Sequence, residues 1–259
     1  MANESISPKK KKSRFGRNLR NLVNRIQRKS RFRSEFKRFQ SMSNIAGTRF
    51  PLKWEDRYPC LKDDTGTTSL RGHYLLHTAW AARKLKEIQP SFHTDIASSL
   101  YFNALVSAFV PIKFYDYRPA EKCLDGLESE FADLMSLPFE DRSLPSVSCM
   151  HVVEHVGLGR YGDTMDPDGD LTAISELKRV TAKGGTLLFV VPIGKPRIQF
   201  NAHRIYGYEQ IIDYFQEFTL KEFALIPDKP DDDKLIINAT QAQSDKQNYG
   251  CGCFWFIRK

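Results

Sequence analysis

The segment from His151 to Asp163 holds the side chains of this sequence that are best suited to acid–base chemistry. His151, Glu154, His155, Arg160 and Asp163 fall within 13 residues, with three glycines among them. Histidine exchanges a proton near neutral pH, and arginine binds carboxylates and phosphates in bidentate fashion. Glycines let the backbone turn tightly. The pattern predicts a polar loop that folds around a ligand.

The segments around this loop predict a strand, loop, helix, strand unit. Residues 144–151 are small and apolar enough for a strand covered on both faces, and residues 173–180 carry a helical period. Two glycines end that helix, and residues 186–192 form a second apolar run. In open α/β sheets, ligands bind at the carboxyl ends of the strands, which is where the loop begins.

Two histidines are candidates for a general base. His155 lies just past the first of these strands and is the first choice, followed by His203. We expect both to follow strands of one parallel sheet, whose carboxyl ends converge on one crevice. Arg160 and Arg204 are candidates for holding an anionic sugar, carboxylate or phosphate, and Asp163 completes the candidate catalytic set. The alternative for each histidine is a hydrogen-bonded structural role.

Two patterns raise the alternative of a metal ion. Aspartates at 163, 166, 168 and 170 offer oxygen ligands for a divalent cation, but Asp and Gly at such spacing also form turns. His151-x-x-Glu154-His155 matches an inverted zinc-protease pattern, which requires a helix, and Glu176 is the only evident further acidic ligand. Here the pattern follows a strand, so a metallohydrolase is not favoured.

Cysteine usage predicts reduced thiols and no metal site. The five cysteines are odd in number and scattered, which is typical of a cytosolic protein. Cys251-Gly-Cys253 has the wrong spacing for a paired zinc knuckle, and we interpret it as strand packing.

With 259 residues, 41% of them hydrophobic, the chain has material for one sizeable core. It shows neither an apolar run of membrane-span length nor a signal-peptide core, so we expect a cytoplasmic protein.

The positive charge is concentrated at the amino terminus. Residues 1–40 hold 14 Lys and Arg against two Glu, a net charge of +12, although the whole chain carries only +8. The remaining residues therefore carry a net charge of −4. Apolar residues recur at helical spacing within this tail, at positions 15, 19, 22, 26, 32, 36 and 39.

Three interpretations of the tail stay open. A basic amphipathic helix over residues 9–39 favours an anionic membrane surface, to which the protein would be peripheral. The same charges bind nucleic acid through phosphates, and residues 8–14 resemble a nuclear import signal, which gives a nuclear alternative. The third interpretation is a solvated tail.

We divide the chain into this tail (1–40), a linker with a helical lead-in (41–90) and a main domain (91–259).

The lead-in and the first half of the main domain show alternating patterns. Residues 41–70 are predicted to be irregular and residues 73–88 to form a helix. Short strands are expected at 92–97, 112–117 and 130–133, with a helix at 100–109. Strands that alternate with helices predict a parallel sheet with right-handed crossovers. The carboxyl ends of the three strands deliver Asp95, Asp116 and Asp133.

The order of these motifs resembles the class I S-adenosylmethionine-dependent methyltransferases. The resemblance covers about residues 91–259 and rests on Asp95-Ile-Ala-Ser, Tyr115-Asp-Tyr, residues 132–139, His151 to His155 and residues 176–185. Residues 157–163, 166–169 and 200–204 resemble, more narrowly, an uncharacterised methyltransferase-like family found in cell-surface polysaccharide gene clusters. The implied fold is a doubly wound, mostly parallel, Rossmann-like α/β sheet.

The resemblance implies a cofactor site for S-adenosylmethionine. Asp116 would accept the ribose hydroxyls, and Asp133 with the backbone of Leu134 would meet the adenine ring. Asp95 and the turn at Ala97 and Ser98 would face the amino-acid part of the cofactor. Tyr117 and His151 complete the predicted cofactor set. The alternative for each acid is a structural one, because Asp at strand ends commonly caps the following helix.

One departure from the family pattern concerns the first loop. Residues 97–101 contain no glycine, which makes a positive φ costly, although Ala and Ser are small enough for close approach to a ligand.

The hypothesis that follows from the resemblance is a methyltransferase that acts on a glycan precursor or other small-molecule acceptor. The alternatives are a non-catalytic binding or scaffold protein that kept the sheet, and a nucleic-acid-associated methyltransferase.

Overall fold

The computed structural model describes residues 14–46, 52–61, 72–121, 124–228 and 234–259. The chain divides into two compact units, residues 1–69 and residues 70–259. Most of the segment at 8–14 that resembles a nuclear import signal lies outside the described residues. No helix in the described ranges is long and apolar enough to cross a membrane.

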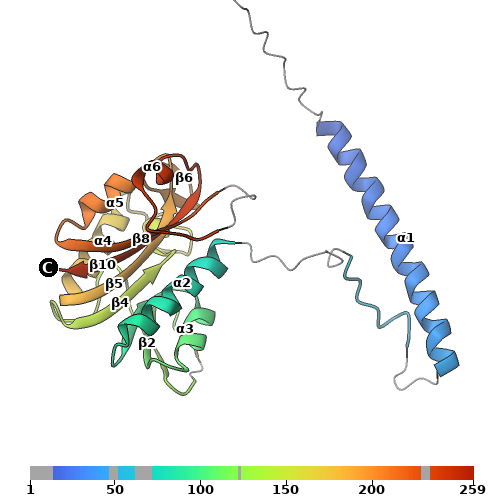
Figure 1. Cartoon of the computed structure of the whole chain (residues 1–259), viewed down its shortest axis with the longest axis horizontal. Coiled ribbons are helices and arrows are strands. Elements are labelled where there is room, and N and C mark those ends of the chain that lie inside the picture. The colour runs from blue at the N-terminus through green and yellow to red at the C-terminus, as the bar shows by residue number, and fades with distance from the viewer. Residues whose placement is uncertain (1–13, 47–51, 62–71, 122–123, 229–233) are drawn as a thin grey trace, which may run out of the picture. The chain divides into compact units, whose positions relative to one another are not determined.

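The first unit is dominated by one long helix, α1 (Arg14–Ala46), drawn in blue in Figure 1. Residues 41–46 therefore continue the helix, and the prediction that they are irregular was wrong. No Gly or Pro lies between Gly16 and Gly47, and Gln, Ser and Met are compatible with a helix. On this helix Phe32 and Phe36 pack against Trp54, with ring centroids 6.1 and 4.9 Å apart.

The second unit is built on an eight-stranded sheet in the order β3-β2-β1-β4-β5-β10-β8-β9. The strands span β1 (His93–Ile96), β2 (Ile112–Asp116), β3 (Leu127–Phe131), β4 (Leu144–Met150), β5 (Thr181–Ile193), β8 (Phe218–Ile226), β9 (Ile236–Ile237) and β10 (Gly250–Arg258). The first five pair in parallel, and β10 lies antiparallel between β5 and β8. This arrangement confirms the predicted doubly wound, mostly parallel sheet.

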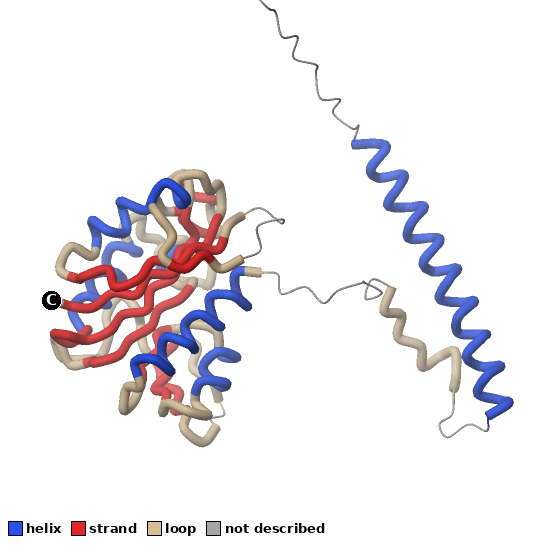
Figure 2. The backbone as a smooth tube through the Cα atoms, in the orientation of Figure 1, coloured by secondary structure: helices blue, strands red, loops and turns tan. Residues whose placement is uncertain are grey.

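Helices cover both faces of the sheet (Figure 2). On one face lie α2 (His73–Ile88) and α3 (Leu100–Val106), and on the other lie α4 (Gly169–Val180) and α5 (Tyr208–Tyr214). Shorter elements are the 3₁₀ helix η1 (Val153–His155), α6 (Gln241–Ser244) and a separate antiparallel pair, β6 (Arg197–Gln199) and β7 (His203–Ile205).

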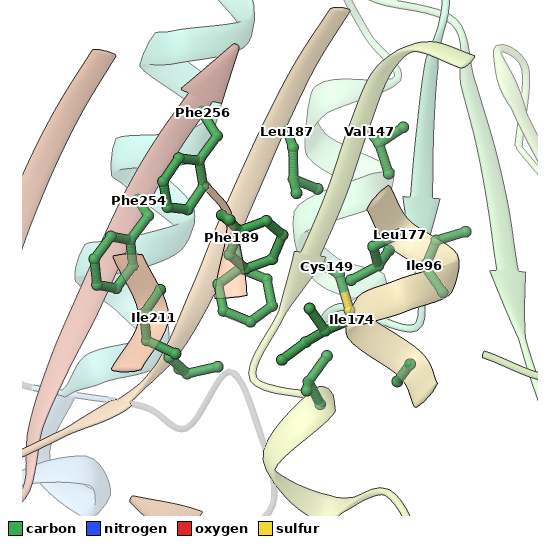
Figure 3. Close-up of a cluster of buried hydrophobic side chains, with 14 of the residues drawn as sticks. Ile96, Val147, Cys149, Ile174, Leu177, Leu187, Phe189, Ile211, Phe254 and Phe256 are labelled. Atoms are coloured by element: carbon green, nitrogen blue, oxygen red, sulfur yellow. The ribbon is translucent and has the colours of Figure 1, made fainter. Parts of the chain in front are cut away.

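The central strands are apolar throughout because both of their faces are buried. Along β5, Leu187 and Phe189 point to the side of α4 and α5, whereas Leu188 and Val190 point to the side of α2 and α3. Figure 3 shows the side chains on the face covered by α4 and α5, where Leu177 of α4 packs with the side chains of the strands. This alternation follows from the two-residue period of a strand.

The third strand lies earlier in the chain than predicted. It spans residues 127–131, so the expected strand at 130–133 was misplaced, and Asp133 follows the strand instead of belonging to it. Only Leu127 in this edge strand is buried. A strand with a single buried residue gives almost no periodic signal.

Helix α2 is anchored to the sheet by polar contacts as well as by apolar packing. The indole Nε1 of Trp80 donates a hydrogen bond to Glu222 Oε1 at 2.8 Å, and Lys84 Nζ lies 2.6 Å from Glu222 Oε2. Trp80 and Leu85 are fully buried against β8 and β10. The helix therefore has a fixed position next to the carboxyl-end loops of the sheet.

Candidate functional site

A cavity of about 370 Å³ opens at the carboxyl ends of the parallel strands. It lies where the chain order reverses, since β2 and β3 extend from one side of β1 and β4 lies on the other. This is the expected ligand position in an open α/β sheet, and the volume is that of a small-molecule site. Eight of the 13 predicted site residues line it: Ala97, Asp116, Tyr117, Asp133, Leu134, His151, His155 and Asp163.

One wall of the cavity carries two acids in tight turns. Asp116 is the last residue of β2, and its Oδ1 accepts a hydrogen bond from the backbone N–H of Arg118 at 2.7 Å. Asp133 accepts one from the backbone N–H of Met135 at 2.8 Å. Each carboxylate is thus held at a fixed place by its own turn. The neighbouring Leu134 is buried and gives this wall an apolar patch.

The glycine-free loop takes the conformation that glycine normally supplies. Ala97 has a φ of 56°, in the left-handed region, and its N–H donates to Tyr115 O at 2.7 Å. A residue with a Cβ adopts this region at a cost of roughly 1 to 2 kcal/mol. The backbone hydrogen bond to Tyr115 holds Ala97 in this conformation. Ala97 lines the cavity, and its small side chain leaves room for a ligand.

Asp95 and Ser98 do not line the cavity. Asp95 is fully buried, and its Oδ1 accepts hydrogen bonds from Ser98 N–H at 3.0 Å and Asn103 Nδ2 at 2.8 Å, while Oδ2 accepts one from the Ser148 hydroxyl. The Ser98 hydroxyl accepts a bond from Met150 N–H. Both residues therefore tie the end of β1 to β4.

Burial perturbs the protonation of this network. The pKa of Asp95 rises from 3.8 to about 6 because burial penalises the charged form, although its hydrogen-bond donors oppose the shift. The buried ring of His93 lies between the hydroxyls of Ser146 and Ser148, at 2.7 and 2.8 Å, and burial lowers its pKa to about 3. His93 was not predicted as a site residue, because nothing in its local pattern indicates the two serines more than 50 residues away.

His155 faces the cavity from the opposite wall in a defined tautomer. Its Nδ1–H donates to the Ala202 carbonyl at 2.6 Å, which leaves Nε2 with the lone pair. Nε2 lies 3.8 Å from Glu154 Oε1. Burial lowers the pKa of His155, while the Glu154 carboxylate opposes that shift. The ring is therefore a neutral base at pH 7.

Glu154 is a buried acid between two histidines. It is 1% exposed, its Oε1 accepts a hydrogen bond from His151 Nδ1 at 2.8 Å, and its Oε2 has no hydrogen-bond partner. Burial raises its pKa to about 7, against the opposing effect of His155. His151 lines the cavity and has a φ of 58°, in the left-handed region.

The loop after η1 is shaped by Asp163. Its carboxylate accepts backbone N–H groups of Gly157, Gly159 and Tyr161 at 2.9, 3.3 and 3.1 Å. Burial acts to raise the pKa of Asp163, but these donors outweigh it and the pKa is lowered. Tyr161, which sequence analysis did not single out, lies edge-on to His155 with centroids 5.8 Å apart and lines the cavity.

The predicted metal alternatives for this loop find no geometric support. Asp163 holds backbone amides, Asp166 accepts Asp168 N–H at 2.9 Å, and Asp170 accepts the Tyr206 hydroxyl at 2.8 Å. These bonds are the turn chemistry that Asp and Gly commonly provide. The zinc-protease pattern needs a helix through His151, but η1 begins only at Val153.

The two predicted arginines lie outside the cavity lining. Arg204 is buried and donates to the carbonyls of Val156 and Pro167 at 2.6 and 2.9 Å, with Asp170 at 3.3 Å. It therefore fastens the loop to the start of α4 instead of facing a ligand. Arg160 is exposed and donates to the Ala202 carbonyl oxygen at 2.9 Å, the same atom that accepts the hydrogen bond from His155 Nδ1.

The placement predicted for His203 was wrong. It is the first residue of β7, in the separate antiparallel pair, and does not follow a strand of the parallel sheet. Its Nε2 bonds to Gln199 Oε1 at 2.7 Å, and its ring stacks on Tyr249. The ring lies 6.3 Å from that of His155 but does not line the cavity.

Comparison with known proteins supports the fold. A family model described as a Caenorhabditis protein of unknown function, DUF268, matches residues 136–248, which is less than half of the chain. No curated protein matches the sequence. The chain is similar to the 1,6-didemethyltoxoflavin-N1-methyltransferase of Burkholderia thailandensis, solved with S-adenosylhomocysteine bound, at 11% identity and a TM-score of 0.50. That match covers 71% of this chain and 78% of that one.

A second solved structure gives a weaker match. The N-methyltransferase NodS of Bradyrhizobium japonicum, in complex with S-adenosylhomocysteine, is 13% identical with a TM-score of 0.47, over 77% of this chain and 91% of that one. At 11% identity, the match to the Burkholderia enzyme shows a common fold and nothing about substrates. The fold of the second unit is thus that of the class I methyltransferases, as the motif order implied.

The buried Asp95 predicts an unusual pH dependence. A folded-state pKa above the unfolded value means that stability is present at low pH and is lost as the pH rises through about 6. We expect Asp95→Asn, which keeps the size and has no charge, to gain about 2 kcal/mol relative to the unmutated protein between pH 4.5 and 7.5. Urea unfolding at both pH values measures this difference. Parallel stability curves for the two proteins would show that the carboxylate is not strained by burial.

Proposed function

We propose that this protein is an S-adenosylmethionine-dependent methyltransferase whose cofactor and acceptor meet in the cavity at the strand reversal. The observation that carries the proposal is the composition of that cavity. Two turn-held acids, Asp116 and Asp133, form one wall, and the neutral base His155 forms the other. The methyltransferase fold supports the same conclusion.

The first wall fits the nucleoside end of the cofactor. Carboxylate oxygens accept hydrogen bonds from vicinal hydroxyls, a role that suits Asp116 at the end of β2. Asp133 and the buried Leu134 offer a polar edge and an apolar surface for a purine ring. Ala97, small and in the left-handed region, lets the backbone approach a ligand closely. When bound, S-adenosylmethionine supplies an electrophilic methyl group.

His155 is the residue we assign to proton removal. Its Nδ1–H is fixed on the Ala202 carbonyl, so Nε2 is the atom that accepts a proton from a hydroxyl or amine. The carboxylate of Glu154 at 3.8 Å stabilises the imidazolium that forms. His155 is 13% exposed in its side chain, so bulk water competes little for this proton.

For the acceptor we propose a glycan precursor or a similar small polar molecule. The support is the resemblance of residues 157–163, 166–169 and 200–204 to a family from polysaccharide gene clusters, together with the loop that bounds the cavity. Tyr117 and Tyr161 expose about half of their surface at this mouth, 58% and 49%. Such rings offer an apolar face with a polar tip to a hydroxylated molecule. A cytoplasmic setting belongs to the same proposal.

We further propose that α1 brings the protein to an anionic membrane surface, rather than to nucleic acid. Between residues 22 and 42 its side chains are largely exposed, and the apolar Leu22, Ile26 and Phe39 each expose more than half of their surface. Basic residues lie between them. An exposed helix with both features inserts its apolar side chains among headgroups, while Lys and Arg attract anionic lipids.

Cofactor binding is tested by removing the acid at the end of β2. We expect Asp116→Asn to weaken S-adenosylmethionine binding by roughly tenfold to a hundredfold, because a charge-assisted hydrogen bond to the ribose is lost. Asp213→Asn, on the exposed surface of α5, removes the same charge and should leave the affinity unchanged. Isothermal titration measures both. If the unmutated protein fails to bind at millimolar cofactor, the scaffold alternative replaces the enzyme.

The general-base assignment predicts a loss of turnover without a loss of cofactor affinity. We expect His155→Gln to reduce the rate about 10²- to 10⁴-fold. His203→Gln should have a much smaller effect, because its ring does not line the cavity. The readout is release of S-adenosylhomocysteine with a panel of nucleotide sugars and glycans as acceptors. Equal losses in both variants would contradict the assignment.

The membrane proposal predicts that binding depends on residues 1–40. Their removal changes the net charge from +8 to −4, so sedimentation with vesicles containing phosphatidylserine should be abolished. Raised salt should have a similar effect, since surface attraction decays within about 8 Å at physiological ionic strength. Ile26→Ser tests the apolar part and should weaken binding at constant charge. Equal retention of intact and truncated protein would refute membrane attachment, and a preference for RNA or DNA would favour the nucleic-acid alternative.

A further inference from the structure

A group of metal-ligating side chains lies beside the cavity and is not used by the proposed methyl transfer. It consists of His73 in α2, His151 just after β4, and Cys251 in β10. The three donor atoms all lie within 4.8 Å of one another, and His151 Nε2 is 3.3 Å from Cys251 Sγ. The rings of His73 and His151 are stacked nearly parallel, with centroids 6.0 Å apart.

This geometry is close to that of a zinc site. Zn–N bonds of about 2.0 Å and Zn–S bonds of about 2.3 Å in a tetrahedron place neighbouring donors roughly 3.3 to 3.6 Å apart. The His151–Cys251 pair already has that separation, and the widest pair needs to close by about 1 Å. We propose that His73, His151 and Cys251 bind a Zn²⁺ ion that joins α2 to the sheet at the edge of the cavity.

The environment of His151 supports this assignment. A zinc-bound histidine usually donates its other ring N–H to a carboxylate, which fixes the tautomer and strengthens the ligand. Here Nδ1–H donates to Glu154 Oε1 at 2.8 Å, which leaves the Nε2 lone pair on the side of Cys251. Glu154 is almost fully buried, and a cation nearby would offset the cost of burying its charge.

His77 packs beside this cluster without belonging to it. It lies one helical turn after His73, and its ring centroid is 4.9 Å from that of His151. Its Nδ1–H donates to the His73 carbonyl at 2.6 Å, while its Nε2 is buried without a hydrogen-bond partner. A buried nitrogen of this kind is normally satisfied. That nitrogen is not among the donor atoms that lie within 4.8 Å of one another, so we assign the fourth position on the ion to water, as in zinc sites with three protein ligands.

A row of three contacting side chains, Cys251, His151 and Glu154, also has the order of a nucleophile, a base and an orienting acid. Burial argues against that interpretation, because Cys251 is 0% exposed and does not line the cavity, so no substrate reaches its sulfur. The ion is therefore proposed as a cross-link. On binding, the Cys251 thiol releases its proton to solvent and the thiolate takes the zinc bond.

Cobalt binding to the reduced full-length protein tests the site. Co²⁺ should bind with a stoichiometry of one and give a thiolate-to-metal absorption band, and Zn²⁺ should remove that band and raise the melting temperature. We expect Cys251→Ser to abolish the band and to weaken Zn²⁺ binding at least 100-fold. Cys60→Ser removes an exposed thiol outside the cluster and should change neither result.

A second variant keeps the test decisive if Cys251→Ser does not fold. His73 is only partly buried at the start of α2, so His73→Asn should preserve the fold and still reduce Zn²⁺ affinity strongly. The proposal is overturned if the unmutated protein gives no thiolate band with Co²⁺. It is also overturned if His73→Asn binds Zn²⁺ as tightly as the unmutated protein.

Discussion

The structure depends on how β1 is joined to β4. These two parallel strands are neighbours in the sheet, yet the chain leaves them toward opposite edges, and the cavity opens where they separate. The fully buried carboxylate of Asp95 spans this junction, with donors from Ser98, Asn103 and Ser148. A buried acid is costly unless it is hydrogen-bonded, so the junction is well defined only while all of these partners are present. Ala97, the residue directly after β1, has a positive φ.

A second buried acid, Glu154, connects the two sites that we propose. One of its oxygens accepts a bond from His151 and lies 3.8 Å from Nε2 of His155. It therefore orients a ligand of the proposed zinc ion and stabilises the proposed general base at the same time. The long loop that follows is held separately, by Asp163 on its backbone amides and by Arg204 on its carbonyls.

Much of the sheet and part of the site follow from local sequence patterns. The central strands are apolar on both faces, so their ends are easy to locate, and Asp116 and His155 were found by their position after such ends. The roles of Asp95 and Arg204 were not predictable, because Ser148 and Val156, to which they bond, are 53 and 48 residues away in the chain. His203 was misplaced since β6 and β7 are three residues each and carry no periodic signal. The His151–Cys251 contact joins residues 100 positions apart, which spacing alone does not reveal.

The central claim is that the cavity at the strand reversal is a cofactor site, and a crystal structure of the protein grown with saturating S-adenosylhomocysteine tests it most directly. We predict that the ligand lies in this cavity with its ribose hydroxyls on the carboxylate of Asp116 and its adenine beside Leu134. Crystals grown under these conditions in which the ligand is absent from the cavity, or lies elsewhere on the protein, would contradict the account.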